Sequence, residues 1–195
     1  MNEPYVEVVP EADLQRRVAQ LGAEIADDYR TTVPVIVGVL KGSVPFLADL
    51  VRAMDSTVQV DFLSLTRFGE EGRVSIAMDV SVPLQGRDVL IVEDIVDTGL
   101  TLTALHRMLM LREPKSLRTV TLLDKAPRRI VDIDLAYRGF EIGDEFLLGY
   151  GLDWGGRYRN VRSLWAVMDL ATFAEDPQPF TDLVHSPSGG AFLHR

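Results

Sequence analysis

Residues 89–102 read Val-Leu-Ile-Val-Glu-Asp-Ile-Val-Asp-Thr-Gly-Leu-Thr-Leu. Four consecutive apolar residues, mostly β-branched, predict a strand that is buried on both faces, because such strands lose the alternation of exposed ones. Apolar residues recur at helical spacing after Gly99, and Thr98 is the expected N-cap. A strand, a polar loop and a helix N-terminus in this order predict an anion site, where backbone N–H groups of residues 98–102 converge on a phosphate.

Three carboxylates, Glu93, Asp94 and Asp97, lie within five residues at the end of this strand. Alone they would repel one another and any phosphate. They suit a ligand that also brings hydroxyls, a divalent cation or a developing positive charge, and a sugar phosphate that reacts through an oxocarbenium-like centre offers all three. A solvated acidic loop before a helix is the simpler alternative. It accounts for one Asp better than for the whole pattern.

The run at 89–101, VLIVEDIVDTGLT, resembles the 5-phosphoribosyl-1-pyrophosphate (PRPP) signature of type I phosphoribosyltransferases. Its Glu-Asp-Ile-x-Asp-Thr-Gly form is similar to the hypoxanthine-guanine branch of that family. The resemblance implies that Glu93 and Asp94 hold the ribose hydroxyls, directly and through Mg²⁺, and that Asp97 is the general base. It also implies that Thr98, Gly99, Leu100 and Thr101 bind the 5'-phosphate.

Hydrophobic periodicity predicts one α/β domain with a mainly parallel, twisted sheet flanked by helices. The expected elements are a helix at 11–30, a helix after Ser43, strands at 34–40, 58–65, 74–78, 117–123, 135–140 and 164–170, and a short apolar run at 146–152. The family resemblance places the domain at residues 1–173, with a small hood made from the N-terminal and 140–170 segments. Residues 174–195 are expected to be a tail, disordered or resting on the surface.

Lys41 and Gly42 follow the predicted strand 34–40 and open a helix, so their backbone could hold a second anion. A Lys-Gly pair alone is usually just a turn, and the spacing of a P-loop is absent. The resemblance implies pyrophosphate binding here, with an unusual cis peptide bond before Lys41. It also implies that Arg159 pairs with pyrophosphate, while Arg157 is a competitor for that role or a surface charge.

The resemblance also implies a purine site. Lys125, at the end of a predicted strand, is expected to donate to O6 of a 6-oxopurine, and Phe146 to stack on the base. Leu147 is expected to offer backbone groups to the base edge, and Asp153 to help hold a second Mg²⁺ through water. The simpler alternatives are a solvated strand-end charge for Lys125 and core packing for Phe146.

Residues 66–72 are expected to form a hairpin or mobile loop that closes over the site and excludes water. Arg67 and Phe68 stand where the family usually presents a Ser-Tyr pair. Phe68 has no hydroxyl to donate, whereas Arg67 could pair with pyrophosphate. The substitution puts loop closure and catalytic rate in question.

The chain has 195 residues, no Cys and a formal net charge of -9. The charge argues against a nucleic-acid surface and against binding to anionic membranes. The missing thiols exclude disulfides, zinc-thiolate sites and cysteine nucleophiles. With no signal-like N-terminus and no apolar run of roughly 18 residues, a cytoplasmic location is expected. A homodimer or homotetramer is expected from the family alone.

The predicted function is the conversion of PRPP and hypoxanthine or guanine, with Mg²⁺, to the nucleoside 5'-monophosphate and pyrophosphate. Three alternatives stay open. One is a PRPP-binding regulator with weak or no catalysis, which the Arg67-Phe68 pair favours. Another is a phosphoribosyltransferase for xanthine or another oxo-base. The last is an unrelated nucleotide-binding α/β enzyme, although the sequence lacks both Walker A and Gly-x-Gly-x-x-Gly motifs.

Overall fold

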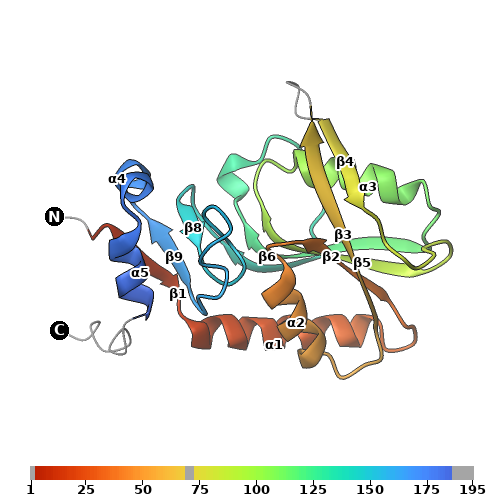
Figure 1. Ribbon diagram of the computed structural model, residues 1–195. Helices are drawn as coiled ribbons and strands as arrows, with labels where there is room; N and C mark the ends of the chain where they lie inside the picture. Colours follow the sequence, from red (N-terminus) through yellow and green to blue (C-terminus); the bar gives the residue numbers. More distant parts are fainter. Residues whose placement is uncertain (1–2, 69–72, 186–195) are drawn as a thin grey trace. The chain divides into compact units, whose positions relative to one another are not determined.

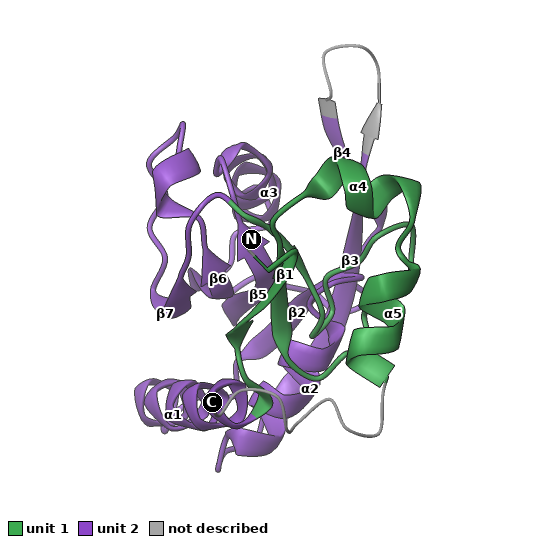
Figure 2. Ribbon diagram, turned by 90° about the vertical axis from the view of Figure 1, so that its left-hand side faces the viewer, with its two compact units in different colours: residues 1–11, 145–195 green, residues 12–144 purple. Residues whose placement is uncertain are grey.

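The computed structural model describes residues 3–68 and 73–185. The chain divides into two compact units, one formed by residues 1–11 and 145–195 (unit 1) and the other by residues 12–144 (unit 2; Figure 2). Within the described residues, none of the helices has the length and apolar character of a membrane-crossing segment.

Unit 2 contains a six-stranded sheet in the order β4-β3-β2-β5-β6-β7 (Figure 1). All neighbouring strands are parallel except β4, which is antiparallel to β3. The strands are β2 (Val35–Leu40), β3 (Gln59–Phe68), β4 (Arg73–Met78), β5 (Asp88–Val96), β6 (Ser116–Asp124) and β7 (Tyr137–Glu141). The helices are α1 (Glu11–Asp28), α2 (Val44–Ala53), α3 (Leu100–Met110) and the short 3₁₀ helix η1 (Ala126–Arg128). The predicted fold class, a mainly parallel sheet flanked by helices, is therefore confirmed.

Strands β2 and β5 form the buried centre of this sheet. Residues 35–37 and 89–92 are fully buried, as the unbroken apolar runs predicted. Val35 and Val37 belong to the core that contains the apolar face of α3, whereas Gly38, on the opposite face of β2, lies close to Leu47 of α2. Helices therefore cover both faces, α1 and α2 on one side and α3 on the other (Figure 1). Because β2 and β5 are parallel neighbours, the loops after them leave the same edge of the sheet.

The hairpin β3–β4 matches the predicted polar segment, with one change in its limits. Strand β3 continues to Phe68, three residues beyond the predicted end, and Arg67 and Phe68 pair with Val74 and Arg73 of β4. Residues 69–72, the rest of the predicted loop, lie outside the described residues.

Unit 1 contains a three-stranded antiparallel sheet in the order β1-β9-β8. Its strands are β1 (Tyr5–Val9), β8 (Phe146–Leu148) and β9 (Leu164–Val167), and two helices follow, α4 (Leu170–Glu175) and α5 (Gln178–His185). Strand β1 was not predicted. The expected last strand ends at Val167 because Asp169 caps α4 and accepts a hydrogen bond from Thr172 N at 3.0 Å. The assignment of residues 1–173 to one domain with a hood stays a prediction.

The disordered form of the expected tail is wrong as far as His185. Residues 178–185 form α5, and Phe180 is fully buried together with Phe173 of α4. The two rings lie 5.9 Å apart in an edge-on arrangement, and Tyr158 contacts both. Burial of two large aromatic rings is what keeps this Pro-containing segment folded. Residues 186–195, the remainder of the expected tail, lie outside the described residues.

Candidate active site

The acidic loop at the end of β5 has one buried and two more accessible carboxylates. Glu93 is buried at 8% exposure. Burial raises the pKa of Glu93 well above its ordinary value, and the neighbouring charge of Asp94 adds to this effect. Asp94 is partly exposed, and its Oδ1 accepts a hydrogen bond from Ile95 N at 2.8 Å. A cation or hydroxyl donors at this loop would favour the charged form of Glu93.

The Lys41-Gly42 turn after β2 meets this loop, as the common edge of the sheet predicted. A Cβ atom on Gly42 would collide with the carboxylate of Asp94, so the Asp94 side chain occupies the space that any residue other than glycine would need at position 42. The peptide bond between Leu40 and Lys41 is cis, as the resemblance implied. Ser43 continues the turn into α2 and donates from Oγ to Val39 O at 2.6 Å.

The N-terminus of α3 carries the backbone groups predicted to bind phosphate. The N-cap is Gly99 rather than the predicted Thr98, because this position has φ 82°, a conformation that glycine adopts without strain. The hydroxyl of Thr98 instead accepts a hydrogen bond from Leu100 N at 3.4 Å. The first intrahelical bond runs from Thr103 N to Gly99 O at 2.9 Å. The amides at positions 100–102 therefore precede the helical hydrogen-bond ladder, where anions are bound.

Asp97 forms an ion pair that the sequence did not indicate. Its Oδ1 lies 2.9 Å from Nε of Arg128, and the Asp97 side chain is 44% exposed. Nη1 of Arg128 lies 2.9 Å from Oδ1 of Asp144. Arg128 and Asp144 were both missed; the signal that could have found Arg128 is the Arg pair that closely follows Lys125 at the end of a strand.

Lys125 lies at the same edge of the sheet, directly after β6. It is 7% exposed, which excludes the alternative of a solvated surface charge. Its backbone N donates to Val96 O at 2.9 Å, and its Nζ donates to Asp144 O at 3.4 Å. The backbone of Lys125 is therefore attached to the loop that carries Asp97, and its ammonium group is held by Asp144.

The other predicted residues belong to unit 1. Phe146 is partly buried and packs edge-on against Trp154, with ring centroids 5.5 Å apart, and Leu147 is 6% exposed. Asp153 pairs with Nη2 of Arg159 at 2.6 Å.

Arg159 also donates from Nη1 to Gly151 O at 2.5 Å. Arg157, its competitor for the predicted pyrophosphate role, lies over the ring of Tyr158, with 5.6 Å between Cζ and the ring centroid.

The predicted metal ligands are divided between the units, with Glu93 and Asp94 in unit 2 and Asp153 in unit 1. Across residues 3–68 and 73–185, no three His, Asp or Glu side chains are grouped so as to hold a metal ion by themselves. Two adjacent carboxylates, one of them buried, fit a hard cation that completes its coordination with water and ligand oxygens.

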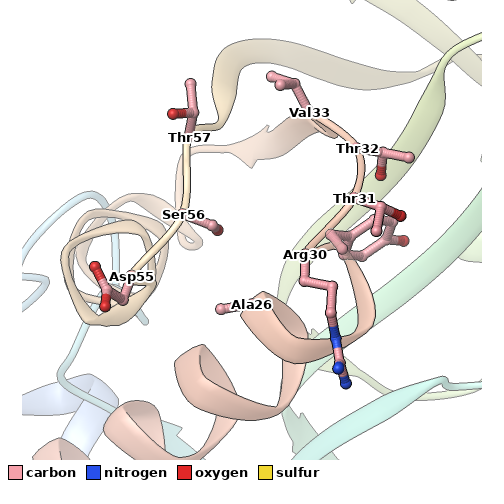
Figure 3. Close-up of a pocket in the computed structure, with 9 residues that line it drawn as sticks. Ala26, Arg30, Thr31, Thr32, Val33, Asp55, Ser56 and Thr57 are labelled. Carbon is pink, nitrogen blue, oxygen red and sulfur yellow. The ribbon is translucent and has the colours of Figure 1, made fainter.

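A separate pocket of about 490 Å³ lies where β2 and β3 begin, at the other end of these strands from the acidic loop. Figure 3 shows the residues that line it. It is lined by residues 30–33 before β2 and 55–57 before β3, together with Ala26 and Tyr29 of the α1 region. None of the predicted site residues lines it. Arg30 points away from the cavity in Figure 3 and pairs with Asp27 at 2.6 Å.

Comparison with known proteins gives the same family as the sequence pattern. The phosphoribosyl transferase domain family matches residues 9–154. The chain is 43% identical over 158 residues to the hypoxanthine-guanine phosphoribosyltransferase of Bacillus subtilis, covering 79% of this chain and 88% of the relative. It is 44% identical over 169 residues to the hypoxanthine phosphoribosyltransferase of Escherichia coli K12, covering 84% and 95%.

Among solved structures, a Bacillus anthracis hypoxanthine-guanine phosphoribosyltransferase with HEPES in its active site matches with a TM-score of 0.81. It is 40% identical, and the match covers 85% of this chain and 99% of that one. The chain therefore belongs to the phosphoribosyltransferase family, in its hypoxanthine-guanine branch.

Proposed function

We propose that this protein transfers the phosphoribosyl group of PRPP to hypoxanthine or guanine, forming IMP or GMP and pyrophosphate. One observation carries the proposal: the Lys41-Gly42 turn packs against the acidic loop of β5, and that loop leads into the N-terminus of α3. This arrangement offers two anion-binding backbones with carboxylates between them. PRPP has the complementary pattern of a 5'-phosphate and a pyrophosphate separated by ribose hydroxyls.

PRPP would be bound through its three parts. Residues 98–101 at the start of α3 hold the 5'-phosphate, assisted by the helix dipole. Glu93 and Asp94 hold the ribose 2'- and 3'-hydroxyls. Lys41 and Gly42 bind the pyrophosphate, and Arg159 is assigned to the same group by family resemblance.

The reaction is a displacement at ribose C1. The lone pair of purine N9 forms the new C–N bond while the C1–O bond to pyrophosphate breaks, and the electron pair leaves with pyrophosphate. Positive charge develops on the ribose ring and is stabilised by the carboxylates of Glu93 and Asp94. The proton released from the base passes from N7 to Asp97, whose accessible carboxylate suits a general base.

Mg²⁺ belongs to the same proposal, with Glu93, Asp94 and Asp153 as the residues that would hold it, in part through water. When bound, the ion would neutralise charge on the pyrophosphate oxygens and favour their departure. The buried carboxyl of Glu93 supports this assignment, because a buried anion requires a compensating cation or donors.

The purine would be recognised by its 6-oxo group and its ring face. Recognition of O6 is assigned to the ammonium group of Lys125, and its burial and its hydrogen bond to the Asp144 carbonyl support this assignment. Phe146 is assigned to stacking, Leu147 to backbone contacts with the base edge, and Asp153 to the second metal position. A donor at O6 favours hypoxanthine, guanine and xanthine over adenine but does not choose among the three.

A PRPP-binding regulator with little catalysis remains a second candidate, and the Arg67-Phe68 pair on β3 favours it. Phe68 supplies no hydroxyl, whereas Arg67 is a candidate partner for pyrophosphate. Binding of PRPP without nucleotide formation from any base would support this candidate.

The test is incubation of the protein with PRPP, Mg²⁺ and, separately, hypoxanthine, guanine, xanthine, adenine and uracil, followed by chromatography of the products. IMP and GMP are the expected products. Formation of xanthosine monophosphate as the main product would change the preferred base, and absence of every nucleotide would contradict the proposed activity. A cytoplasmic homodimer or homotetramer is part of the proposal, and light scattering after size exclusion tests the assembly.

A further inference from the structure

Backbone hydrogen bonds join the turn after β6 to the loop that contains Asp97. Lys125 N donates to Val96 O at 2.9 Å, on one side of Asp97. On the other side, Ile130 N and Val131 N both donate to Thr98 O, at 3.0 and 3.2 Å. Asp97 therefore lies between two backbone attachments to the segment 125–131, and the distance between Asp97 and the η1 turn is set by the main chain.

Arg128, the last residue of η1, forms an ion pair with the carboxylate of Asp97. Nε lies 2.9 Å from Asp97 Oδ1, and Nη1 lies 2.9 Å from Asp144 Oδ1. The guanidinium group is planar and rigid, so contact at two of its nitrogens fixes its orientation. Asp144 also accepts a hydrogen bond from Lys125 Nζ through its carbonyl oxygen, at 3.4 Å. One residue thus anchors both the proposed purine donor and the arginine that holds the proposed base.

We propose that Arg128 is a positioning residue for catalysis and acts through Asp97; this inference rests on the proposed function. Asp97 Oδ1 is buried and has no hydrogen-bond partner among the described residues, so the charge of Arg128 at 2.9 Å is what holds this oxygen. Because the Asp97 side chain as a whole is 44% exposed, Oδ2 is the accessible oxygen of the carboxylate. The charged residues on Asp97's own loop are Glu93 and Asp94, and those on the turn attached to it are Lys125, Arg128 and Arg129.

Stability does not account for this ion pair. The side chains of Arg128, Asp97 and Asp144 are 46%, 44% and 71% exposed, and ion pairs between such accessible groups contribute little to folding. Orientation of a catalytic group has a larger effect, since misplacement by about 1 Å can lower a rate roughly 100-fold. The expected consequence of losing Arg128 is therefore a lower kcat with an unchanged melting temperature.

A double-mutant cycle tests the inference, with Arg128→Gln made in the wild type and in Asp97→Asn. In the wild type, kcat for hypoxanthine is expected to fall roughly 10- to 100-fold, with the KM for PRPP unchanged. In Asp97→Asn, the same substitution is expected to change kcat less than about 2-fold, because the group it positions is gone. Arg128→Lys should restore part of the rate, and Asp144→Asn should cause a smaller loss than Arg128→Gln.

Arg112→Gln is the matched control. Arg112 also uses two nitrogens in an ion pair, since its Nη1 and Nη2 each lie 2.7 Å from a carboxylate oxygen of Asp79, and this pair lies away from the acidic loop. The kcat of this variant is expected to equal that of the wild type. Equal losses from Arg128→Gln in both backgrounds, or no loss in the wild type, would overturn the positioning role. A wild-type protein that forms no nucleotide would instead contradict the proposed function itself. If Arg128→Gln fails to fold, Arg128→Lys and Asp144→Asn carry the same comparison.

Discussion

The acidic loop at residues 93–99 of unit 2 and the chain segment at residues 173–185 of unit 1 use opposite kinds of side chain. The loop follows a fully buried strand and presents carboxylates, hydroxyls and amides at the edge of a sheet. The terminal segment carries Phe173 and Phe180, both fully buried in a cluster of aromatic rings. The first region therefore presents polar groups at the end of a rigid strand, and the second packs apolar rings. Substitutions in the two regions should therefore separate activity from stability.

Asp97→Asn is expected to have the largest effect, a fall in kcat of about 10² to 10⁴, because an amide cannot accept the proton from the base. The melting temperature should stay close to that of the wild type, since Asp97 is 44% exposed and such ion pairs contribute roughly 0 to 1 kcal/mol. Steady-state kinetics and calorimetry measure the two quantities. Asp55→Asn, an exposed carboxylate before β3, is the control. Unchanged turnover in Asp97→Asn would remove the general-base assignment.

Phe180→Ala tests the other region. Deleting a fully buried phenyl ring should lower the free energy of unfolding by about 3 to 5 kcal/mol. Urea denaturation followed by tryptophan fluorescence is a suitable measurement, because Trp165 lies 6.0 Å from Phe180 between ring centroids.

Leu183→Ala on the same helix is the matched control, since Leu183 is 37% exposed and should change the free energy much less. Equal effects of the two substitutions would mean that α5 does not pack as described.

Gly42→Ala should disturb the contact between the two loops of unit 2. The added methyl group collides with the Asp94 carboxylate, so this side chain or one of the two loops must move. We expect kcat/KM for PRPP to fall roughly 10- to 100-fold. Gly86→Ala provides a comparison in which a Cβ meets no atom within 4 Å, although its φ of 67° adds local strain. Wild-type kinetics in Gly42→Ala would show that the close approach is not needed for substrate binding.

The smallest of these effects should be a change in how stability depends on pH without ligand, and Glu93→Gln measures it. Glu93 has a raised pKa when folded, so the unfolded chain releases this proton near pH 4.5 whereas the folded chain keeps it to higher pH. The contribution of protonated Glu93 to folding stability is therefore fully present below about pH 4.5 and is lost as pH rises through the folded pKa. Between the unfolded and the folded pKa of Glu93, the loss is about 1.4 kcal/mol per pH unit.

Without ligand and in EDTA, the wild type should therefore become less stable relative to Glu93→Gln as pH rises above 4.5. Melting temperatures measured between pH 4 and 8 test this, with the exposed Glu175→Gln as control. A constant difference across this range would mean that Glu93 titrates alike in the folded and unfolded states.

The first region could be predicted from sequence because its signals are local. Four apolar residues, three carboxylates and a Thr-Gly pair follow one another within 14 residues, and the parallel sheet then brings Lys41, Gly42 and Lys125 to the same edge. The ion pair between Asp97 and Arg128 could not be predicted in this way. It depends on how the turn after β6 is fastened to the loop after β5, which no spacing in the sequence specifies.

The second region was misjudged for a related reason. Pro177 and Pro179 and the surrounding polar residues indicate a tail, yet proline is compatible with the first turn of a helix. Only the aromatic partners of Phe173 and Phe180 reveal that these rings form a core, and these partners are Tyr5 of β1, Trp154, Tyr158 and Trp165 of β9. A few apolar residues at helical spacing do not show whether a short helix is packed or exposed unless the residues that they contact are also known.

The central claim is that the loop after β5 and the start of α3 bind a phosphoribosyl group. Calorimetric titration of the wild-type protein with PRPP in Mg²⁺, compared with ATP and NAD under the same conditions, tests it most directly. The account predicts saturable binding of PRPP, weaker binding when Thr98 and Thr101 are both replaced by Val, and no comparable binding of ATP or NAD. Binding of ATP or NAD in preference to PRPP, or PRPP affinity unaffected by the double replacement, would contradict it.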